Sequence, residues 1–301
     1  MGPCDHHVHL ERGPYERSWL ERFLKTAAAR GVGEVGFVEH LYLFKEAVGL
    51  LGDGGPGGLA ASPVRFIDER YTRSIDEFLA FVERARQDGL PVKVGVEFDY
   101  HPEDEEAIGR FLDTYPFDYR IGSVHCLNSL VFDMTPDIPF WQSGDIRAIY
   151  ADYFRMLARL ARSGLADIIG HSDVIKVWGH RPSGPGAEAF LREQYESLAE
   201  AVAAGRRLGP GGRPSPGDAR TAVEINTAGW RKPVGEVYPG PGLLAAFKTD
   251  GVPIVFSSDA HDPRDVGADF DRAMAYAREA GYQSTVEFAG RRASEKPIAE
   301  A

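Results

Sequence analysis

The chain has 301 residues, of which 43% are hydrophobic and 26% are charged, as is typical of a globular protein. Its 45 acidic and 34 basic residues give a formal net charge of −11, so we do not expect it to bind nucleic acid or an anionic membrane. A small anionic substrate is still permitted, because a few bound divalent cations would invert the local field of an acidic cleft.

The cysteine count and the apolar pattern indicate a cellular compartment. Two cysteines, Cys4 and Cys126, are too few for a disulfide framework and favour a reducing environment. The start MGPCDHHVHLERG lacks the apolar run of a signal peptide, and no apolar stretch approaches the roughly 18 residues that span a membrane. We therefore expect a cytoplasmic protein, whose oligomeric state the sequence does not indicate.

Seven short, nearly continuous apolar segments are predicted to be strands that are covered on both faces. They are CDHHVHL (4–10), VGEVGFVEH (32–40), PVKVGVEFDY (91–100), YRIGSVHCL (119–127), LADIIGH (165–171), TAVEINTAG (221–229) and GVPIVFSSDAH (251–261). Segments with helical periodicity lie between them, each ending at a glycine suited to a helix C-terminus. These helical segments are 15–31, 74–89, 145–164 and 269–281. The alternation predicts a single α/β domain with a parallel sheet or barrel.

Glycine and proline are concentrated in three segments, 49–63, 181–188 and 205–218. We interpret these segments as surface loops rather than domain linkers, because the strand–helix alternation resumes after each one. The core is expected to cover about residues 4–285, and a polar tail over about 289–301 is expected to be loosely held.

Histidines, carboxylates and one asparagine gather at the C-terminal ends of the predicted strands. In chain order they are His7 and His9, His40, Glu97 and Asp99, His125, His171, Glu224 and Asn226, and Asp259 and His261. In a parallel α/β barrel these ends converge on one face, where active sites are built. Residues two apart on a strand point the same way, which brings His7 together with His9 and Asp259 together with His261.

Imidazoles mixed with carboxylates suit zinc, manganese or iron better than magnesium. One tetrahedral ion takes four ligands, and this face offers at least eight, so we predict two or three divalent ions with Glu97 as a bridge. Metals about 3.5–4 Å apart acidify a bridging water and clamp the oxygens of an in-line displacement. The pattern therefore indicates hydrolysis, most naturally of a phosphate ester.

Seven motifs carry a resemblance to a known family. They are DHHVHLERGPY, GFVEHLY, VGVEFDYHPEDE, IGSVHCL, IIGHSDVIK, EINTAGWRKPVGEVYP and SSDAHDPRDVG. In this order they resemble the motifs of the PHP (polymerase and histidinol phosphatase) superfamily, over residues 4 to 281. The segment INTAGWRKPVGEVYP favours the branch of PHP-type histidinol-phosphate phosphatases. The resemblance implies a distorted seven-stranded (β/α)7 TIM-like barrel that holds a trinuclear metal site.

The resemblance also implies a ligand set for each ion. The first ion would be held by His7, His9, Glu97 and Asp259, and Glu97 would bridge to a second ion held by His125 and His171. The third would be held by His40 and His261 with a ligand from the loop after the first strand. At that last position the family commonly has a histidine or an acid where this chain has Tyr15. We predict Glu11 as the ligand, with Glu16 as the alternative.

Further polar residues have predicted roles around the metals. Arg231 is the main candidate for gripping phosphate, because a guanidinium matches two phosphate oxygens at once. Lys176 and Asn226 are further candidates for binding the substrate, and Asp5, Asp99 and Asp173 are candidates for supporting a ligand from behind. His6 should alternate away from His7 and pack elsewhere, and Cys126 is expected to be a buried thiol.

The predicted reaction is hydrolysis of L-histidinol phosphate to L-histidinol and inorganic phosphate, in histidine biosynthesis. A metal-bridging hydroxide would attack phosphorus directly, while His40 and Arg231 neutralise the phosphate oxygens. Asp259 or His261 would protonate the leaving alkoxide.

Three alternatives stay open. A PHP phosphoesterase could act on another phosphomonoester, a cyclic phosphodiester or a nucleotide. An amidohydrolase-type barrel also begins with two histidines spaced by one residue, but it normally uses a lysine-derived bridge where this chain has Glu97. The third alternative is a metal-binding module without enzymatic activity.

Overall fold

The computed structural model describes residues 2–50, 71–127, 130–135, 141, 145–205, 208–209, 213–214 and 220–298. Most of the Gly/Pro-rich segments 49–63 and 205–218 therefore lies outside the described residues. The third such segment, 181–188, is a loop as predicted until helix α6 begins at Ala187.

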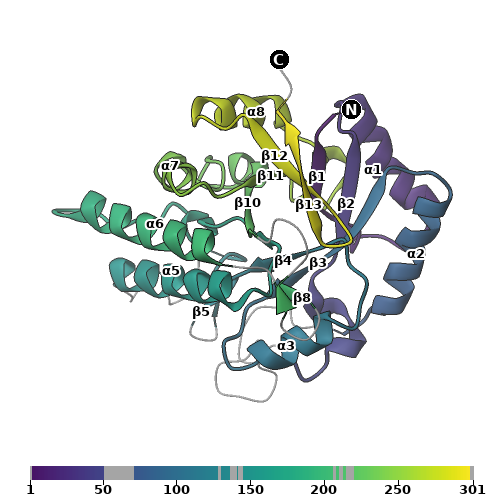
Figure 1. Cartoon of the computed structure of the whole chain (residues 1–301), viewed down its shortest axis with the longest axis horizontal. Coiled ribbons are helices and arrows are strands. Elements are labelled where there is room, and N and C mark those ends of the chain that lie inside the picture. The colour runs from purple at the N-terminus through teal and green to yellow at the C-terminus, as the bar shows by residue number, and fades with distance from the viewer. Residues whose placement is uncertain are drawn as a thin grey trace.

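Seven parallel strands form one sheet, and each falls inside one of the predicted segments. In spatial order they are β1 (Cys4–His9), β2 (Glu34–Val38), β3 (Val92–Asp99), β4 (Tyr119–Ser123), β7 (Ile168–Ile169), β10 (Ala222–Asn226) and β11 (Ile254–Ser257). The amide of His9 donates to the carbonyl of Ala260 at 2.8 Å, so β1 also joins the chain that follows β11. The sheet is thus a nearly closed barrel, which confirms the predicted fold class (Figure 1).

Helices surround this barrel. They are α1 (Arg17–Ala29), α2 (Ile75–Gln87), α3 (Glu105–Leu112), α5 (Ile146–Ser163), α6 (Ala187–Ala204), α7 (Pro241–Thr249) and α8 (Phe270–Glu279). Four of them confirm the predicted helical segments; α3, α6 and α7 were not predicted. Helix α6 follows directly on a Gly/Pro-rich loop, whose composition hides its start. Figure 1 shows α5 and α6 running side by side on one side of the barrel.

Short elements occupy the ends of the strands and the loops. The 3-10 helices are η1 (Leu41–Leu43), η2 (Lys45–Ala47), η5 (Val174–Lys176), η7 (Thr227–Arg231) and η8 (Pro263–Asp265). Two small hairpins pair β5 (Cys126–Leu127) with β6 (Leu130–Val131), and β8 (Leu208–Gly209) with β9 (Arg213–Pro214). The segment 119–127, predicted as one strand, is therefore a barrel strand that ends at Ser123, followed by the first strand of a hairpin.

The inside of the barrel has its own apolar cluster, separate from the larger one beneath the helices. It contains Val38, Tyr119, Ile121, Ile168, Ala222, Val255, Val286 and Phe288. Tyr119 crosses the interior and donates its hydroxyl to the carbonyl of His6 at 2.7 Å. Gly36 leaves room for this ring, because a Cβ at that position would lie 1.7 Å from the Tyr119 Oη.

The C-terminal segment corrects one prediction. Residues from 289 on were expected to form a loose tail, but β12 (Ser284–Ala289) and β13 (Arg292–Pro297) form an antiparallel hairpin. Val286 and Phe288 point from β12 into the inner cluster and are buried. The exposed, polar residues of β13 resemble a disordered tail in composition, although their backbone is paired.

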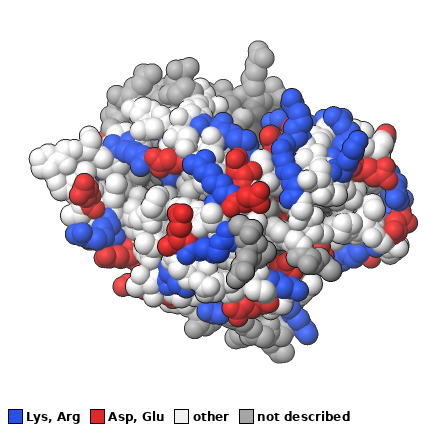
Figure 2. Space-filling view, turned by 90° about the horizontal axis from the view of Figure 1, so that it is seen from above, with Lys and Arg blue, Asp and Glu red and all other residues white. Residues whose placement is uncertain are grey.

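The hydrophobicity of the helices and the distribution of surface charges agree with what the composition predicts. Among the described residues, no helix is long and apolar enough to cross a membrane. In the view of Figure 2, basic and acidic side chains are interspersed over the visible face rather than gathered into areas of one sign.

Candidate metal centre

Strand β1 brings two histidines to the C-terminal end of the barrel through an irregularity. The pairing of β1 with β2 shifts register between Asp5 and Val8. His7 and His9 both face the centre, as their spacing predicted. His6, however, does not lie beneath the helices as simple alternation would place it. The centroid of its ring lies 5.4 Å from that of Tyr119 in the barrel interior. Burial lowers the pKa of His6 to about 4.

Three groups of side chains have ligand atoms within 4.8 Å of one another. The groups are His7, His9 and Asp259; Glu97, His125 and His171; and His9, Glu11, His40 and His261. They contain all nine residues that were predicted to hold metal. The structure brings these residues together, while their role as ligands stays a prediction.

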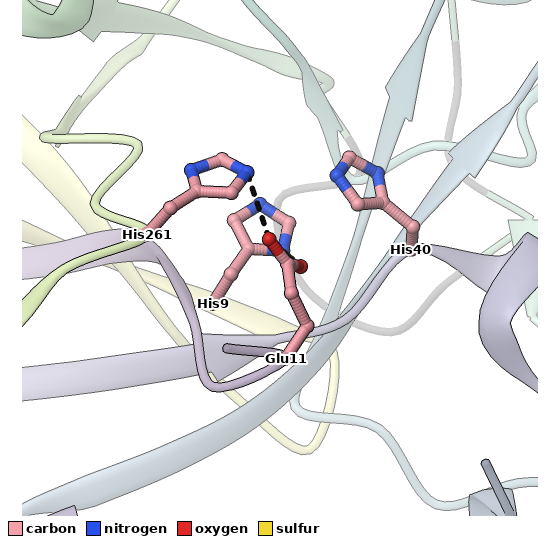
Figure 3. Close-up of side chains that lie close together, drawn as sticks. All are labelled: His9, Glu11, His40 and His261. Atoms are coloured by element: carbon pink, nitrogen blue, oxygen red, sulfur yellow. Dashed lines mark ion pairs between the residues drawn. The ribbon is translucent and has the colours of Figure 1, made fainter. Parts of the chain in front are cut away.

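The third group contains the position where the chain departs from the family pattern. Figure 3 shows Glu11, on the loop after β1, among the rings of His9, His40 and His261. Glu11 Oε1 lies 3.3 Å from His261 Nε2, and Glu11 Oε2 lies 3.4 Å from His9 Nδ1. Glu16 instead stands at the N-terminus of α1. The geometry thus favours Glu11 over Glu16.

Glu97 is the carboxylate at the middle of the centre. Its Oε2 lies 2.7 Å from His40 Nδ1, 3.3 Å from His7 Nε2 and 3.6 Å from His9 Nε2. Its Oε1 lies 3.2 Å from His171 Nε2 and 3.5 Å from His125 Nε2. One oxygen thus faces the rings from β1 and β2, and the other faces those from β4 and β7. This is the placement that a bridging carboxylate requires.

Carboxylates behind two of the histidines hold their rings. Glu224 Oε1 lies 2.7 Å from His7 Nδ1, and Asp99 Oδ1 lies 2.8 Å from His125 Nδ1. An imidazole that donates Nδ1–H to a carboxylate presents its Nε2 lone pair to the other side, which is how histidine binds a metal. Asp99 therefore lies where the sequence predicted a supporting carboxylate. The partner of His7 is Glu224, which the sequence analysis placed only among the residues at strand ends.

The donor set fits a divalent metal. His7 Nε2, both ring nitrogens of His9 and Glu97 Oε2 are buried and have no hydrogen-bond partner among the described residues. The 2.7 Å contact between His40 Nδ1 and Glu97 Oε2 does not have the geometry of a hydrogen bond. Such groups are costly to bury unless something else satisfies them. Two ligands of one tetrahedral ion, each at about 2.1 Å, are about 3.4 Å apart. The distances from His7 and His9 to Glu97 Oε2, 3.3 and 3.6 Å, agree with that separation.

The electrostatics keep the carboxylates ionised. Burial would raise the pKa of Glu97, but His40, His7 and His125 hold that pKa well below its usual value. Burial opposes ionisation of Asp259 as well, and His7 and His261 lower its pKa. Burial and the adjacent imidazoles His261 and His40 lower the pKa of His9. At His7, His40 and His125 the neighbouring carboxylates outweigh burial and raise the pKa, so these histidines would lose a proton when a metal binds, whereas His9 is already neutral.

The backbone at Asp259 is strained and anchored. Asp259 has φ 53°, in the left-handed region that few residues other than glycine adopt. The preceding residue, Ser258, donates its amide to Asp5 at 2.9 Å and accepts from Arg231 at 2.6 Å. Asp5, predicted to support a ligand, therefore acts on the loop that presents Asp259. These anchors keep the Asp259 carboxylate directed at the centre.

The residues predicted to bind substrate have partners within the protein. Arg231 donates to Ser258 O and to Thr227. Lys176 is buried and donates to Asp173 at 2.7 Å and to the carbonyl of Val237. These bonds do not favour a contact of Arg231 or Lys176 with phosphate or substrate. Such contacts stay predictions.

Asn226 was also predicted to bind substrate, and its side chain bonds within the protein. It accepts from Ala228 N at 3.0 Å and donates to Glu224 at 3.1 Å and to Asp259 at 3.4 Å. These bonds favour a positioning role, and a contact of Asn226 with substrate stays a prediction.

The sequence reading missed several polar groups beside the centre. Ser123 donates to Glu97 Oε1 at 2.7 Å, and the buried Glu39 places Oε2 3.9 Å from His9 Nδ1. The ring of Tyr42 stacks on His40 with centroids 4.6 Å apart. Serine and tyrosine carry no metal-ligand pattern, and Glu39 lies directly before His40, to which the family motif assigns the ligand role.

Comparisons with known proteins agree with this geometry. The model of the PHP domain family matches residues 5–228. A probable histidinol-phosphatase of Deinococcus radiodurans is 31% identical, and the alignment covers 97% of this chain and 98% of that protein. The histidinol-phosphatase of Bacillus subtilis is 26% identical over 89% of this chain and 96% of its own length.

A solved structure has a similar fold. The crystal structure of histidinol phosphate phosphatase from Lactococcus lactis, complexed with zinc, L-histidinol and phosphate, superposes with a TM-score of 0.71 at 19% identity. The match covers 97% of this chain and 98% of that one.

Proposed function

The chain belongs to the PHP domain family, and from that premise we propose that it is a metal-dependent phosphomonoesterase that hydrolyses L-histidinol phosphate to L-histidinol and inorganic phosphate. One observation carries the proposal: nine histidine and carboxylate side chains, of the kinds that bind metal, converge from distant parts of the sequence on one end of the barrel. The substrate is supported by the histidinol-phosphatases to which the chain is similar over nearly its full length.

Two or three divalent ions are proposed. His7, His9, Glu97 and Asp259 would hold the first, and Glu97 would share a second with His125 and His171. His40, Glu11 and His261 would hold a third. Zinc, manganese and iron all suit these mixed nitrogen and oxygen ligands. When bound, such ions lower the pKa of water and stabilise negative charge on a phosphoryl group.

The residues of the chain then orient the reaction. Glu224 and Asp99 fix the tautomers of His7 and His125, and Arg231 positions Asp259 through the carbonyl of Ser258. His261 and His40 are 27% and 13% exposed and face the open side of the centre. Water adds to phosphorus as the ester P–O bond breaks, and the leaving alkoxide takes a proton from His261. Despite its burial, Asp259, the other predicted donor, is kept ionised by His7 and His261 and has no proton to give. His40, with the ion that it would help to hold, would stabilise negative charge at the phosphate oxygens.

Phosphate release from L-histidinol phosphate tests the proposal directly. Protein of measured metal content is assayed with and without a chelator, beside a panel of nucleotides, cyclic diesters and sugar phosphates. We expect chelator-sensitive release with L-histidinol phosphate as the preferred substrate. Glu97→Gln should lose orders of magnitude in kcat, whereas Glu279→Gln, at an exposed position on α8, should match the parent. Preference for a diester or a nucleotide would contradict the assignment.

A further inference from the structure

The chain just before α2 contacts the loop that carries Glu11. Arg73 precedes the start of that helix at Ile75. Its guanidinium donates from Nη2 to the carbonyl of Glu11, and from both Nη1 and Nη2 to the carbonyl of Gly13 at 3.1 Å. The planar guanidinium thus binds two carbonyls of the loop after β1 at once, which restricts how that loop can move.

The backbone of Arg73 is fixed to a second loop of the centre. Its amide donates to the carbonyl of Leu43 at 2.9 Å, and its carbonyl accepts from the amide of Lys45 at 2.9 Å. These bonds form a parallel bridge to Phe44, on the segment that follows His40 through η1 and η2. Arg73 therefore joins the loop of Glu11 to the segment after His40, and both of these residues are predicted ligands of the third ion.

Tyr15, where the family commonly has a metal ligand, packs against other groups. The guanidinium carbon of Arg73 lies 4.9 Å from the centroid of the Tyr15 ring. The same ring packs against Phe78 and Phe81 of α2, with centroids 5.6 and 5.7 Å apart. The Tyr15 hydroxyl donates to the buried Glu39 at 3.4 Å. These contacts hold residue 15 in an aromatic cluster with α2, so the ligand from this loop has to come from another residue.

Glu11 meets that requirement. Its side chain reaches from the loop toward His261, as Figure 3 shows, and its Oε2 is buried without a hydrogen-bond partner among the described residues. The carbonyl of the same residue is the one that accepts from Arg73 Nη2. A side chain that binds a metal has to be held within about 0.5 Å of its productive position, and an anchored backbone provides this.

We infer that Arg73 is a positioning residue for the metal centre, which holds the loop after β1 so that Glu11 supplies the loop ligand of the third ion. The inference rests on the ion that the proposed function assigns to Glu11, His40 and His261. Arg73 acts through backbone carbonyls rather than by its charge. The two modes of action have opposite signs, because removing a nearby positive charge would by itself strengthen the binding of a cation, whereas loss of positioning weakens it.

The test measures the zinc bound per chain over a series of buffered free zinc concentrations. Glu11→Gln identifies the binding step that belongs to the third ion. We expect Arg73→Ala to weaken zinc binding in that same step by about 10- to 100-fold, and to leave the other steps within about 3-fold. Arg155→Ala, which removes an exposed arginine on α5, should match wild type in every step.

Two further variants separate positioning from a general loss of structure. Arg73→Lys keeps the charge but replaces two donor nitrogens with one, so we expect a smaller loss in the same step; this variant decides the test if Arg73→Ala does not fold. In a Glu11→Gln background, Arg73→Ala should weaken that step by less than about 2-fold more, because the ligand that Arg73 positions is already absent.

The inference is overturned if Arg73→Ala binds zinc as wild type does, binds it more tightly, or weakens every step together with its melting temperature. It is also overturned if Glu11→Gln weakens no step, or if the two changes multiply in the double mutant. Phosphate release by wild type tests the proposed function separately. Wild type that binds zinc as expected but does not hydrolyse L-histidinol phosphate would refute the function and leave the role of Arg73 standing.

Discussion

Replacing Glu224 by glutamine should weaken metal binding, although Glu224 is not itself a predicted ligand. The side chain is fully buried, and each of its oxygens has a defined task. Oε1 lies 2.7 Å from His7 Nδ1, while Oε2 accepts from the amide of His171 at 2.9 Å and from Asn226 Nδ2 at 3.1 Å. Burial opposes its ionisation, but His7 and His171 lower its pKa below the usual value.

Glutamine cannot perform both tasks. If its amide oxygen faces His7, its NH2 group confronts two donors, the His171 amide and the Asn226 side chain. If its NH2 group faces His7 Nδ1, that nitrogen becomes the acceptor and Nε2 carries the proton, so Nε2 has no lone pair for a metal.

The expected loss of metal affinity follows from these contacts. Loss of a partner behind a metal-binding histidine typically weakens metal affinity by about 10- to 100-fold, which corresponds to about 1.4 to 2.7 kcal/mol. Competition with a chromophoric chelator gives the zinc Kd of wild type, Glu224→Gln and the exposed control Glu279→Gln. We expect a 10- to 100-fold weaker Kd for Glu224→Gln alone, with a parallel fall in kcat at limiting zinc. Unchanged zinc affinity would refute the reasoning that Glu224 sets the tautomer of His7.

Three further predictions concern stability. Gly36→Ala should lower the free energy of unfolding in urea by about 1–3 kcal/mol, because the new Cβ would lie 1.7 Å from the Tyr119 hydroxyl. Adding Tyr119→Phe should recover part of this loss. If it recovers none, the assigned clash is wrong. Phe288→Ala should lower the free energy of unfolding by about 3–5 kcal/mol in the same measurement, because it leaves a cavity in the inner apolar cluster of the barrel. A decrease below about 1 kcal/mol would mean that the hairpin of β12 and β13 is not part of the core. Added to metal-free protein, zinc at about 100 times its Kd should raise the free energy of unfolding by about 2.7 kcal/mol, which is measured as a higher melting temperature. If zinc stabilised a Glu97→Gln variant by the same amount, Glu97 would not be a ligand.

The sequence alone determined the barrel and the members of the centre. Apolar runs and helical periodicity are local patterns, so they predicted all seven barrel strands and helices such as α5 before any packing was known. Parallel strands of a barrel end on one face, so the positions of His7, Glu97, His125 and Asp259 at strand ends were sufficient to bring them together.

Tertiary structure decided which group faces which. Glu224 and His7 are 217 residues apart, and no spacing in the sequence relates them. The register shift in β1 accompanies the placement of His6 in the barrel interior, and the hairpin after His125 returns the chain to the carbonyl of His125. Arg231 turns to Ser258 because that carbonyl lies within reach only in the folded chain. Local propensity acts over a few residues, whereas these pairings depend on register and loop path, which are set by the packing of the whole barrel.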